Sequence, residues 1–114
     1  MPPNELDILN GTLDVLVLRA LSWRPMHGYA IARFIRQGSG ESFRILDGAL
    51  YTSLHRMEER GWVASDWGTS DKGKRAKFYT LTTAGRRALR TEQRSWEDYV
   101  AAVARVMSAS PEAV

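Results

Sequence analysis

The sequence predicts a mostly α-helical fold that contains one small β-hairpin, and three observations lead to this prediction. Apolar residues recur at helical spacing in three short segments before residue 61. Two β-prone runs then flank a cluster of turn residues between positions 68 and 73, which is typical of a hairpin. Beyond the hairpin, helical spacing continues from about 84 to 107. A chain of 114 residues, 44% of them hydrophobic, is long enough to bury one core of this kind.

The first two helices are predicted at about 12–22 and from Met26 or His27 to Gly38. The first helix, LDVLVLRAL, is apolar on nearly all sides, so we expect more than one neighbour to bury it. Pro25 separates the two helices, because proline disfavours helical geometry in the residue before it. The apolar stripe of the second helix consists of Ile31, Phe34 and Ile35. A turn-rich stretch and a short extended segment follow in QGSGESFRIL.

The third helix, predicted within LDGALYTSLHRMEERGW at 46–62, has two unlike faces. Asp47 is placed to cap its N-terminus, and Gly61 ends it. The spacing of a buried stripe is kept by Leu50, Leu54 and Met57. The opposite side carries Gly48, Thr52, His55, Arg56 and Glu59. On this pattern alone, the polar face is either solvated surface or a surface that reads a nucleic-acid groove.

The net positive charge of the chain is concentrated in one window that contains the hairpin tip and the start of the last helix. Residues 71–94 carry eight Lys/Arg against two acids, whereas the segments before and after this window have net charges of −1 and −2. Four of the cations fall at the tip of the hairpin: Lys72, Lys74, Arg75 and Lys77. Such a concentration of charge indicates a polyanionic partner or, alternatively, a solvated loop.

The last helix is predicted to begin after Thr82 or Thr83 and to run to Met107. Its apolar residues include Leu89, Trp96 and Val103, which are spaced by sevens, with Tyr99, Val100 and Val106 between them. The stripe continues past what a small domain covers by itself. A heptad-like seam near a free helix end indicates a partner helix.

The composition argues against several other kinds of protein. The absence of cysteine removes disulfides, a thiol nucleophile and cysteine-based zinc sites. His27 and His55 fall on different helices without a third ligand, so we expect no metal and no cofactor. We expect no catalytic residues, because paired carboxylates, Ser/His/Asp spacing and a glycine-rich phosphate loop are all missing. Without a long uncharged apolar run, the chain is expected to be soluble, cytoplasmic and free of membrane partners.

The order of the predicted elements is helix, helix, short strand, helix, two strands and helix, which is the plan of a winged helix domain. In that plan the third helix lies in the major groove of DNA, and the hairpin, or wing, reaches phosphates or the neighbouring minor groove. We therefore expect a winged helix-turn-helix DNA-binding domain at 1–82, a dimerisation helix at 83–108 and a disordered tail at 109–114.

Three blocks of the sequence resemble the PadR family of bacterial winged helix transcriptional regulators, in its short form with a single C-terminal helix. They are GTLDVLVLRALSWRPMHGYAIARFI at 11–35, DGALYTSLHRMEERGWV at 47–63 and KFYTLTTAGRRAL at 77–89. The resemblance extends from Leu6 to about Met107, in the order and spacing of the family. Together the blocks are highly specific, although each alone would be weak.

This resemblance implies a homodimer that binds a partly palindromic double-stranded DNA operator, usually as a repressor, and leaves it on a small-molecule or stress signal. Tyr29 and Tyr51 match the tyrosines that lie near DNA in the family. Thr52 departs from the family pattern, in which proline usually follows Tyr51. This difference restores a backbone N–H and adds a hydroxyl, so it affects the expected base contacts more than the fold.

The candidate site residues form two groups. The expected DNA contacts are Tyr29, Ala49, Tyr51, Thr52, Ser53, His55, Arg56, Lys72, Lys74, Arg75 and Lys77. The expected dimer interface combines the N-terminal apolar segment with the last helix, through Leu9, Leu13, Leu16, Trp96, Tyr99, Val100, Val103, Val106 and Met107. Trp96 is expected to pack in the dimer core, or else to stack on a planar ligand, as the dimer interface does in some relatives.

Two other functions are weighed against a DNA-binding regulator. A winged helix that serves as a protein-interaction module would carry an apolar or acidic face on its third helix. The face with Gly48, Thr52, His55 and Arg56 argues against that alternative. An enzyme would need one of the catalytic spacings that the sequence lacks.

Overall fold

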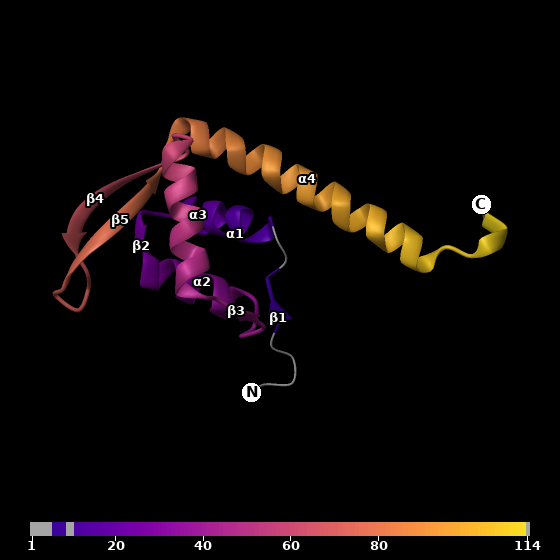
Figure 1. The fold of residues 1–114 in the computed structure, drawn as a ribbon, viewed down its shortest axis with the longest axis horizontal. Coiled ribbons are helices and arrows are strands. Elements are labelled where there is room, and N and C mark those ends of the chain that lie inside the picture. Colours follow the sequence, from indigo (N-terminus) through magenta and orange to yellow (C-terminus); the bar gives the residue numbers. More distant parts are fainter. Residues whose placement is uncertain (1–5, 9–10, 114) are drawn as a thin grey trace.

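The computed structural model describes residues 6–8 and 11–113 of the chain (Figure 1). Its elements, in order, are β1 (Leu6–Asp7), α1 (Thr12–Leu21), β2 (Met26–His27), α2 (Gly28–Gly38), β3 (Phe43–Arg44), α3 (Asp47–Glu59), β4 (Val63–Thr69), β5 (Arg75–Leu81), α4 (Thr83–Ser108) and the 3₁₀ turn η1 (Pro111–Ala113). The mostly helical winged helix architecture with a long C-terminal helix, predicted from the sequence, is confirmed. The turn η1 gives local structure to part of the segment that was predicted to be disordered.

The core forms where α1 meets the other three long helices. Helix α1 contacts α2, α3 and α4, which explains why its sequence is apolar on nearly all sides. Its Val17 and Leu18 are fully buried, together with Ile31 of α2 and the predicted stripe of α3, Leu50, Leu54 and Met57. Helices α2 and α3, which form the helix-turn-helix pair, therefore pack against the same apolar core as α1.

The hairpin belongs to a three-stranded antiparallel sheet of order β2-β5-β4. The sequence predicted a helix start at Met26 or His27. Instead these two residues form β2, pairing with Tyr79 and Phe78, and α2 begins at Gly28. A second small sheet joins β1 to β3 in parallel. Strand β3 lies in the short extended segment predicted within QGSGESFRIL. Strands β1 and β2 were not predicted, because two residues are too few for alternation to reveal a strand and their pairing depends on segments distant in the sequence.

Helix α4 begins in a cap that also fixes it to the hairpin. The Thr82 hydroxyl accepts from the Gly85 backbone N–H at 3.0 Å and donates to the Gly61 carbonyl at 2.7 Å. A Cβ added at Gly85 would overlap the Trp62 carbonyl oxygen, so this close approach requires glycine. Beyond Leu89, α4 leaves the body on the side away from the hairpin (Figure 1). The whole molecule measures 61 × 36 × 21 Å.

Candidate nucleic-acid interface

Helix α3 presents most of its predicted polar face to solvent. Ala49, Tyr51, Thr52 and His55 are exposed, whereas Leu50, Leu54 and Met57 are buried. One turn beyond His55, the Glu59 carboxylate lies 3.8 Å from the His55 Nε2 atom. After the exposed Asp47 in the first turn, the exposed side of α3 carries the small, uncharged residues Gly48, Ala49 and Thr52, where a backbone can approach a groove closely.

Ser53 does not belong to this exposed face. Its side chain is buried, and its hydroxyl donates a 2.6 Å hydrogen bond to Asp14 Oδ1 on α1. The expectation that Ser53 faces DNA is therefore wrong. Its spacing of three after Leu50 and four before Met57 places it on the buried side of the helix.

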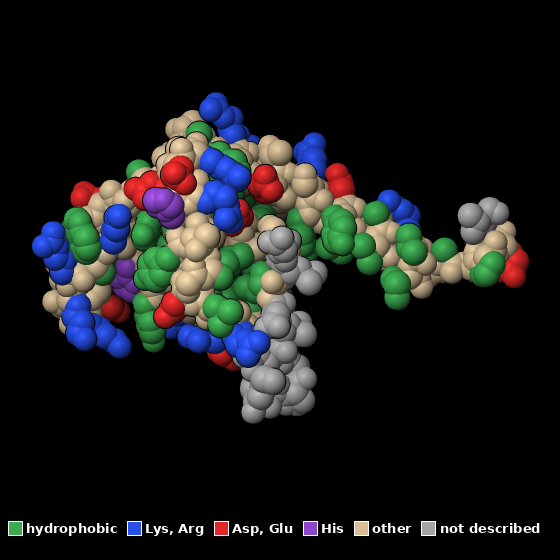
Figure 2. Space-filling view, viewed as in Figure 1, with side chains coloured by type: hydrophobic (Ala, Val, Ile, Leu, Met, Phe, Trp, Pro, Cys, Tyr) green, Lys and Arg blue, Asp and Glu red, His purple; other side chains and the backbone are tan. Residues whose placement is uncertain are grey.

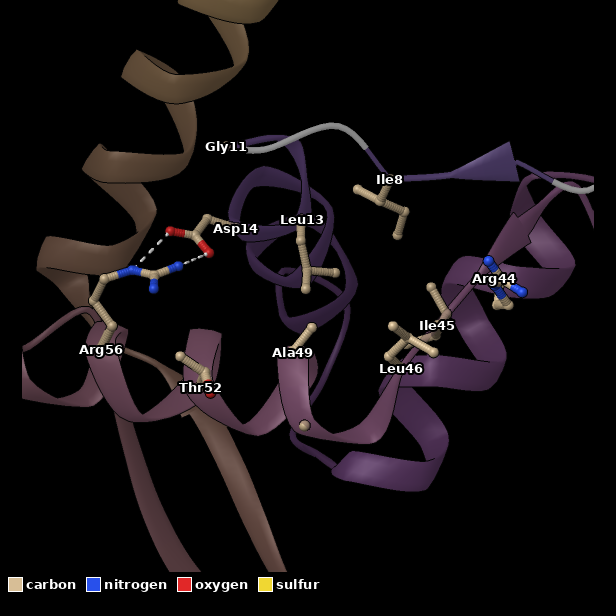
Figure 3. A pocket seen from close by; sticks show the side chains of 11 residues that line it. Ile8, Gly11, Leu13, Asp14, Arg44, Ile45, Leu46, Ala49, Thr52 and Arg56 are labelled. Carbon is tan, nitrogen blue, oxygen red and sulfur yellow. Dashed lines mark hydrogen bonds and ion pairs between the residues drawn. The ribbon is translucent and has the colours of Figure 1, made fainter.

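Arg56 is directed toward the same carboxylate. Its Nη2 atom lies 2.6 Å from Asp14 Oδ1, and its Nε atom donates to Asp14 Oδ2 at 3.3 Å (Figure 3). The side chain of Asp14 is only 15% exposed, and that of Arg56 is 42% exposed. The guanidinium is thus paired with a carboxylate of α1, although the Arg56 side chain is partly exposed.

Tyr51 connects α3 with the start of α2. Its side chain is half exposed, and its hydroxyl lies so close to Gly28 that a Cβ there would overlap it.

The base of the wing packs against α3 around Tyr79. Burial raises the pKa of Tyr79 above its usual value of 10.0, and the nearby Glu58 and Tyr51 raise this pKa further. The Ser65 hydroxyl donates to Glu58 at 2.5 Å, which connects the base of the wing to α3.

The N-terminus of α2 carries the second predicted tyrosine. His27 caps this helix, because its Nδ1 atom accepts from the Ala30 N–H at 3.1 Å, and its ring meets the edge of Phe78. Tyr29 is 58% exposed. Two cations lie over its ring, Arg33 at 5.8 Å and Lys72 at 5.6 Å from the centroid. Tyr29 therefore places an exposed aromatic ring between α2 and the wing.

The wing tip is ordered by its own hydrogen bonds. The Ser70 hydroxyl accepts from the Lys74 N–H at 3.2 Å, and the Ser70 N–H donates to the Lys74 carbonyl at 2.7 Å. Gly73, with φ of 75°, allows the chain to reverse. All four predicted wing cations are exposed, and Figure 2 shows Lys and Arg side chains gathered at this end of the molecule.

One face of the hairpin combines packing at its base with cations farther out. Cross-strand pairing places Ser65 opposite Tyr79 near α3, and Trp67 opposite Lys77 farther along. Trp67 is 57% exposed, and the Arg75 guanidinium lies 4.7 Å from its ring centroid. This stacking keeps the Arg75 side chain extended beside an aromatic surface.

These parts surround a groove of about 760 Å³, here called the wing groove. Its walls come from β2, the start of α2, Tyr51 and the hairpin, and they include six cations: Arg24, Arg33, Lys72, Lys74, Arg75 and Lys77. Sequence reasoning missed Arg24, Arg33 and Trp67. The four-residue spacing from Tyr29 to Arg33 was a usable signal, because it places both on one helical face.

A second groove, of about 470 Å³, lies on the other side of α3 and is here called the α1–α3 groove (Figure 3). Gly48, Ala49 and Thr52 form one wall, and the start of α1 forms another. Apolar side chains extend it toward β3, and the Asp14–Arg56 pair closes its far end. The exposed face of α3 therefore lies between two grooves of different character.

The outer half of α4 exposes the predicted apolar seam, which appears as green side chains along this helix in Figure 2. Every predicted interface residue on α4 is exposed: Trp96, Tyr99, Val100, Val103, Val106 and Met107. Leu13 and Leu16 on α1 are half-buried, and the Leu9 prediction falls outside the described residues. An apolar stripe of this length, exposed on the outer half of a helix, is unusual for a solvent-facing surface.

Within residues 6–8 and 11–113, no three His, Cys, Asp or Glu side chains are grouped as a metal site would need. In this range, too, no helix has the length and apolar character to cross a membrane.

A winged helix with an exposed third helix and a cationic groove defines the DNA-binding class of regulator, and comparison with known proteins gives the family. Residues 17–91 match the transcriptional regulator PadR-like family, so the chain belongs to that family. The transcriptional regulator Rv3488 of Mycobacterium tuberculosis is 35% identical over 82 residues, which cover 72% of this chain and 73% of the relative.

Solved structures agree with this assignment. A PadR family regulator from Eggerthella lenta is 30% identical with a TM-score of 0.72, covering 88% of this chain and 85% of that one. A PadR family regulator from Clostridium difficile is 26% identical, also with a TM-score of 0.72, covering 84% and 98% of the two chains. The resemblance seen in the sequence blocks is thereby confirmed at the level of family and fold.

Proposed function

We propose that this PadR family transcriptional regulator is a cytoplasmic homodimer that binds a specific double-stranded DNA operator, as a repressor. The observation that carries the proposal is the position of the exposed face of α3 beside the wing groove, whose walls hold six cations. The major groove of DNA accommodates one α-helix, and Lys and Arg side chains beside that helix can contact the flanking phosphates. A winged helix that serves as a protein-interaction module would not require these cations.

The exposed face of α3 contacts the bases, and the wing groove contacts the phosphate backbone. Ala49, Thr52 and His55 face the base edges, because they are exposed along one side of α3. Tyr29, Tyr51 and the four wing cations hold the phosphate backbone beside it, together with Arg24 and Arg33 of the wing groove. Phosphate contacts supply affinity and orientation, whereas contacts to base edges select the sequence.

Dimerisation proceeds through α4 and the exposed side of α1. The apolar seam on α4 supports this part of the proposal, since Tyr99 is 63% exposed and Met107 is 79% exposed in the single chain. A second copy that covers the seam removes this apolar surface from water. Dimers of helix-turn-helix proteins read half-sites about 34 Å apart, so the operator is a partial palindrome.

An effector that releases the operator acts at the same interface. Trp96 is 45% exposed on α4, where two copies would bring two indole rings near each other. A planar small molecule between them would stack on both rings and alter the spacing of the subunits. Displacement of the operator by planar compounds, lost in Trp96→Ala but kept in Trp23→Ala, tests this part.

Operator binding is tested with the DNA upstream of the gene that encodes this protein. We expect tight binding to one segment, weaker binding to an unrelated duplex, and a steep dependence on salt. Fluorescence anisotropy titrations from 50 to 200 mM salt, about the range over which phosphate contacts weaken, measure all three. Equal affinity for both duplexes, or no binding at all, contradicts the proposal.

The dimer is tested by Val103→Glu, which places a charge in the apolar seam. We expect a monomer by light scattering and a large loss of operator affinity, because one half-site no longer supports the other. Glu97→Gln on the same helix is the control. A dimer that persists in Val103→Glu contradicts an interface through α4.

A further inference from the structure

Asp14 connects α1 to α3, the helix that we propose contacts the bases and here call the reading helix. It lies in the first turn of α1 and accepts hydrogen bonds from Ser53 at 2.6 Å and from Arg56 at 2.6 and 3.3 Å. These partners are 39 and 42 residues away in the sequence and occupy neighbouring turns of α3. A nearly buried carboxylate that binds both fixes the rotation and height of α3 on α1.

Arg56 has a second property that makes this pairing informative. It is the only Lys or Arg between Asp47 and Glu59, so it is the one permanent cation of α3. Its side chain keeps 42% of its surface exposed, beside Thr52 at the end of the α1–α3 groove (Figure 3). Released from Asp14, a flexible guanidinium at this position reaches any nearby phosphate, whatever the base sequence.

We propose that Asp14 is a specificity-determining residue that withholds the Arg56 guanidinium from DNA and orients α3 through Ser53. With Arg56 paired to Asp14, α3 meets the DNA without an unpaired Lys or Arg side chain. Sequence-independent attraction then comes from the wing groove and not from the reading helix. This inference rests on the proposed DNA-binding function.

The first test is Arg56→Gln, whose amide still has a donor for Asp14. We expect the slope of log affinity against log salt to equal that of the unmodified protein, because no phosphate contact is lost. A direct Arg56–phosphate contact predicts a slope flatter by about 0.9 for each chain bound, and that result overturns the proposal. Operator affinity is expected to change little, because the Ser53–Asp14 hydrogen bond still orients α3.

The second test is Asp14→Asn, which frees Arg56. We expect affinity for an unrelated duplex to rise about threefold to tenfold, with a slope steeper by ~0.9 for each chain, and discrimination for the operator to fall about tenfold. Asp98→Asn on α4 removes the same charge far from α3, and it should leave both slope and discrimination unchanged. An Asp14→Asn protein that matches the Asp98→Asn control overturns the proposal.

A double variant, Asp14→Asn with Arg56→Gln, keeps the net charge of the chain. Its affinity for the unrelated duplex should return to that of the unmodified protein, since no freed cation remains. Persistent excess affinity overturns the role given to Arg56. Thermal unfolding shows whether each variant folds. If Asp14→Asn does not fold, the slope of log affinity against log salt for Arg56→Gln tests the proposal. If the unmodified protein prefers no duplex, the proposed function fails instead.

Discussion

The two grooves beside α3 differ most in what happens to their cations. In the wing groove, six Lys and Arg side chains line the walls, and two of them lie over the ring of Tyr29. In the α1–α3 groove, the cation of the reading helix is paired with Asp14. Positive charge is thus concentrated in the wing groove, where we propose phosphate contacts, whereas the cation of α3 is paired with Asp14 beside the face that we propose reads bases. In the proposed function, the difference teaches that one domain separates affinity from selectivity by placing its charges on different sides of a helix.

The largest expected effect tests the wing side of this comparison. Lys74→Ala combined with Arg75→Ala should weaken binding to operator and unrelated DNA alike, on the order of 100-fold at low salt, and flatten the salt slope by about 1.8 for each chain. Anisotropy titrations at several salt concentrations measure both quantities. The control is Arg94→Ala with Arg105→Ala, which removes equal charge from α4. A changed base preference with intact affinity would show that the wing reads sequence.

A smaller effect is expected from Gly28→Ala, which alters the wall shared by Tyr51 and α2. The added Cβ would overlap the Tyr51 hydroxyl, so the ring must move outward. We expect a stability loss of about 1 kcal/mol and an operator affinity lower by about tenfold, measured by urea unfolding and anisotropy. Gly38→Ala, where a Cβ meets nothing within 4 Å, is the matched control. Equal behaviour of the two variants would remove Tyr51 from the interface.

Thr52→Ala tests the reading side of the comparison. Thr52 is exposed and lines the α1–α3 groove. We expect the preferred base at one operator position to change by ~1–2 kcal/mol in discrimination, while the salt slope stays constant. Binding to a library of operators with single base changes measures this shift. An unchanged preference would leave Ala49 and His55 as the remaining candidates on that face.

The smallest expected effect concerns the base of the wing. Burial, with Glu58 and Tyr51 nearby, raises the pKa of Tyr79 above 10.0, so the folded protein keeps its phenol proton to higher pH than the unfolded chain. The stabilisation is complete below pH ~10 and is lost as the pH rises through the folded pKa. Tyr79→Phe should therefore lose less stability than the unmodified protein as the pH rises above about 10, measured by urea unfolding. Identical profiles would mean that Tyr79 ionises as readily in the folded protein.

The sequence determined the parts of this protein that depend on local spacing. Leu50, Leu54 and Met57 marked the buried side of α3, and the turn cluster between two β-prone runs marked the wing, because side-chain periodicity and turn chemistry act over a few residues. The cap at Thr82 was found for the same reason.

Only the tertiary structure decided how these parts share their charges. Asp14 meets Ser53 and Arg56 across about forty positions, and Arg24 and Arg33 join the wing cations around one groove. No local pattern encodes such pairings, since they depend on how α1, α2 and the hairpin pack around α3. For this reason Ser53 was misplaced on the DNA face, and Arg56, predicted on the polar face, proved to be paired with Asp14 of α1.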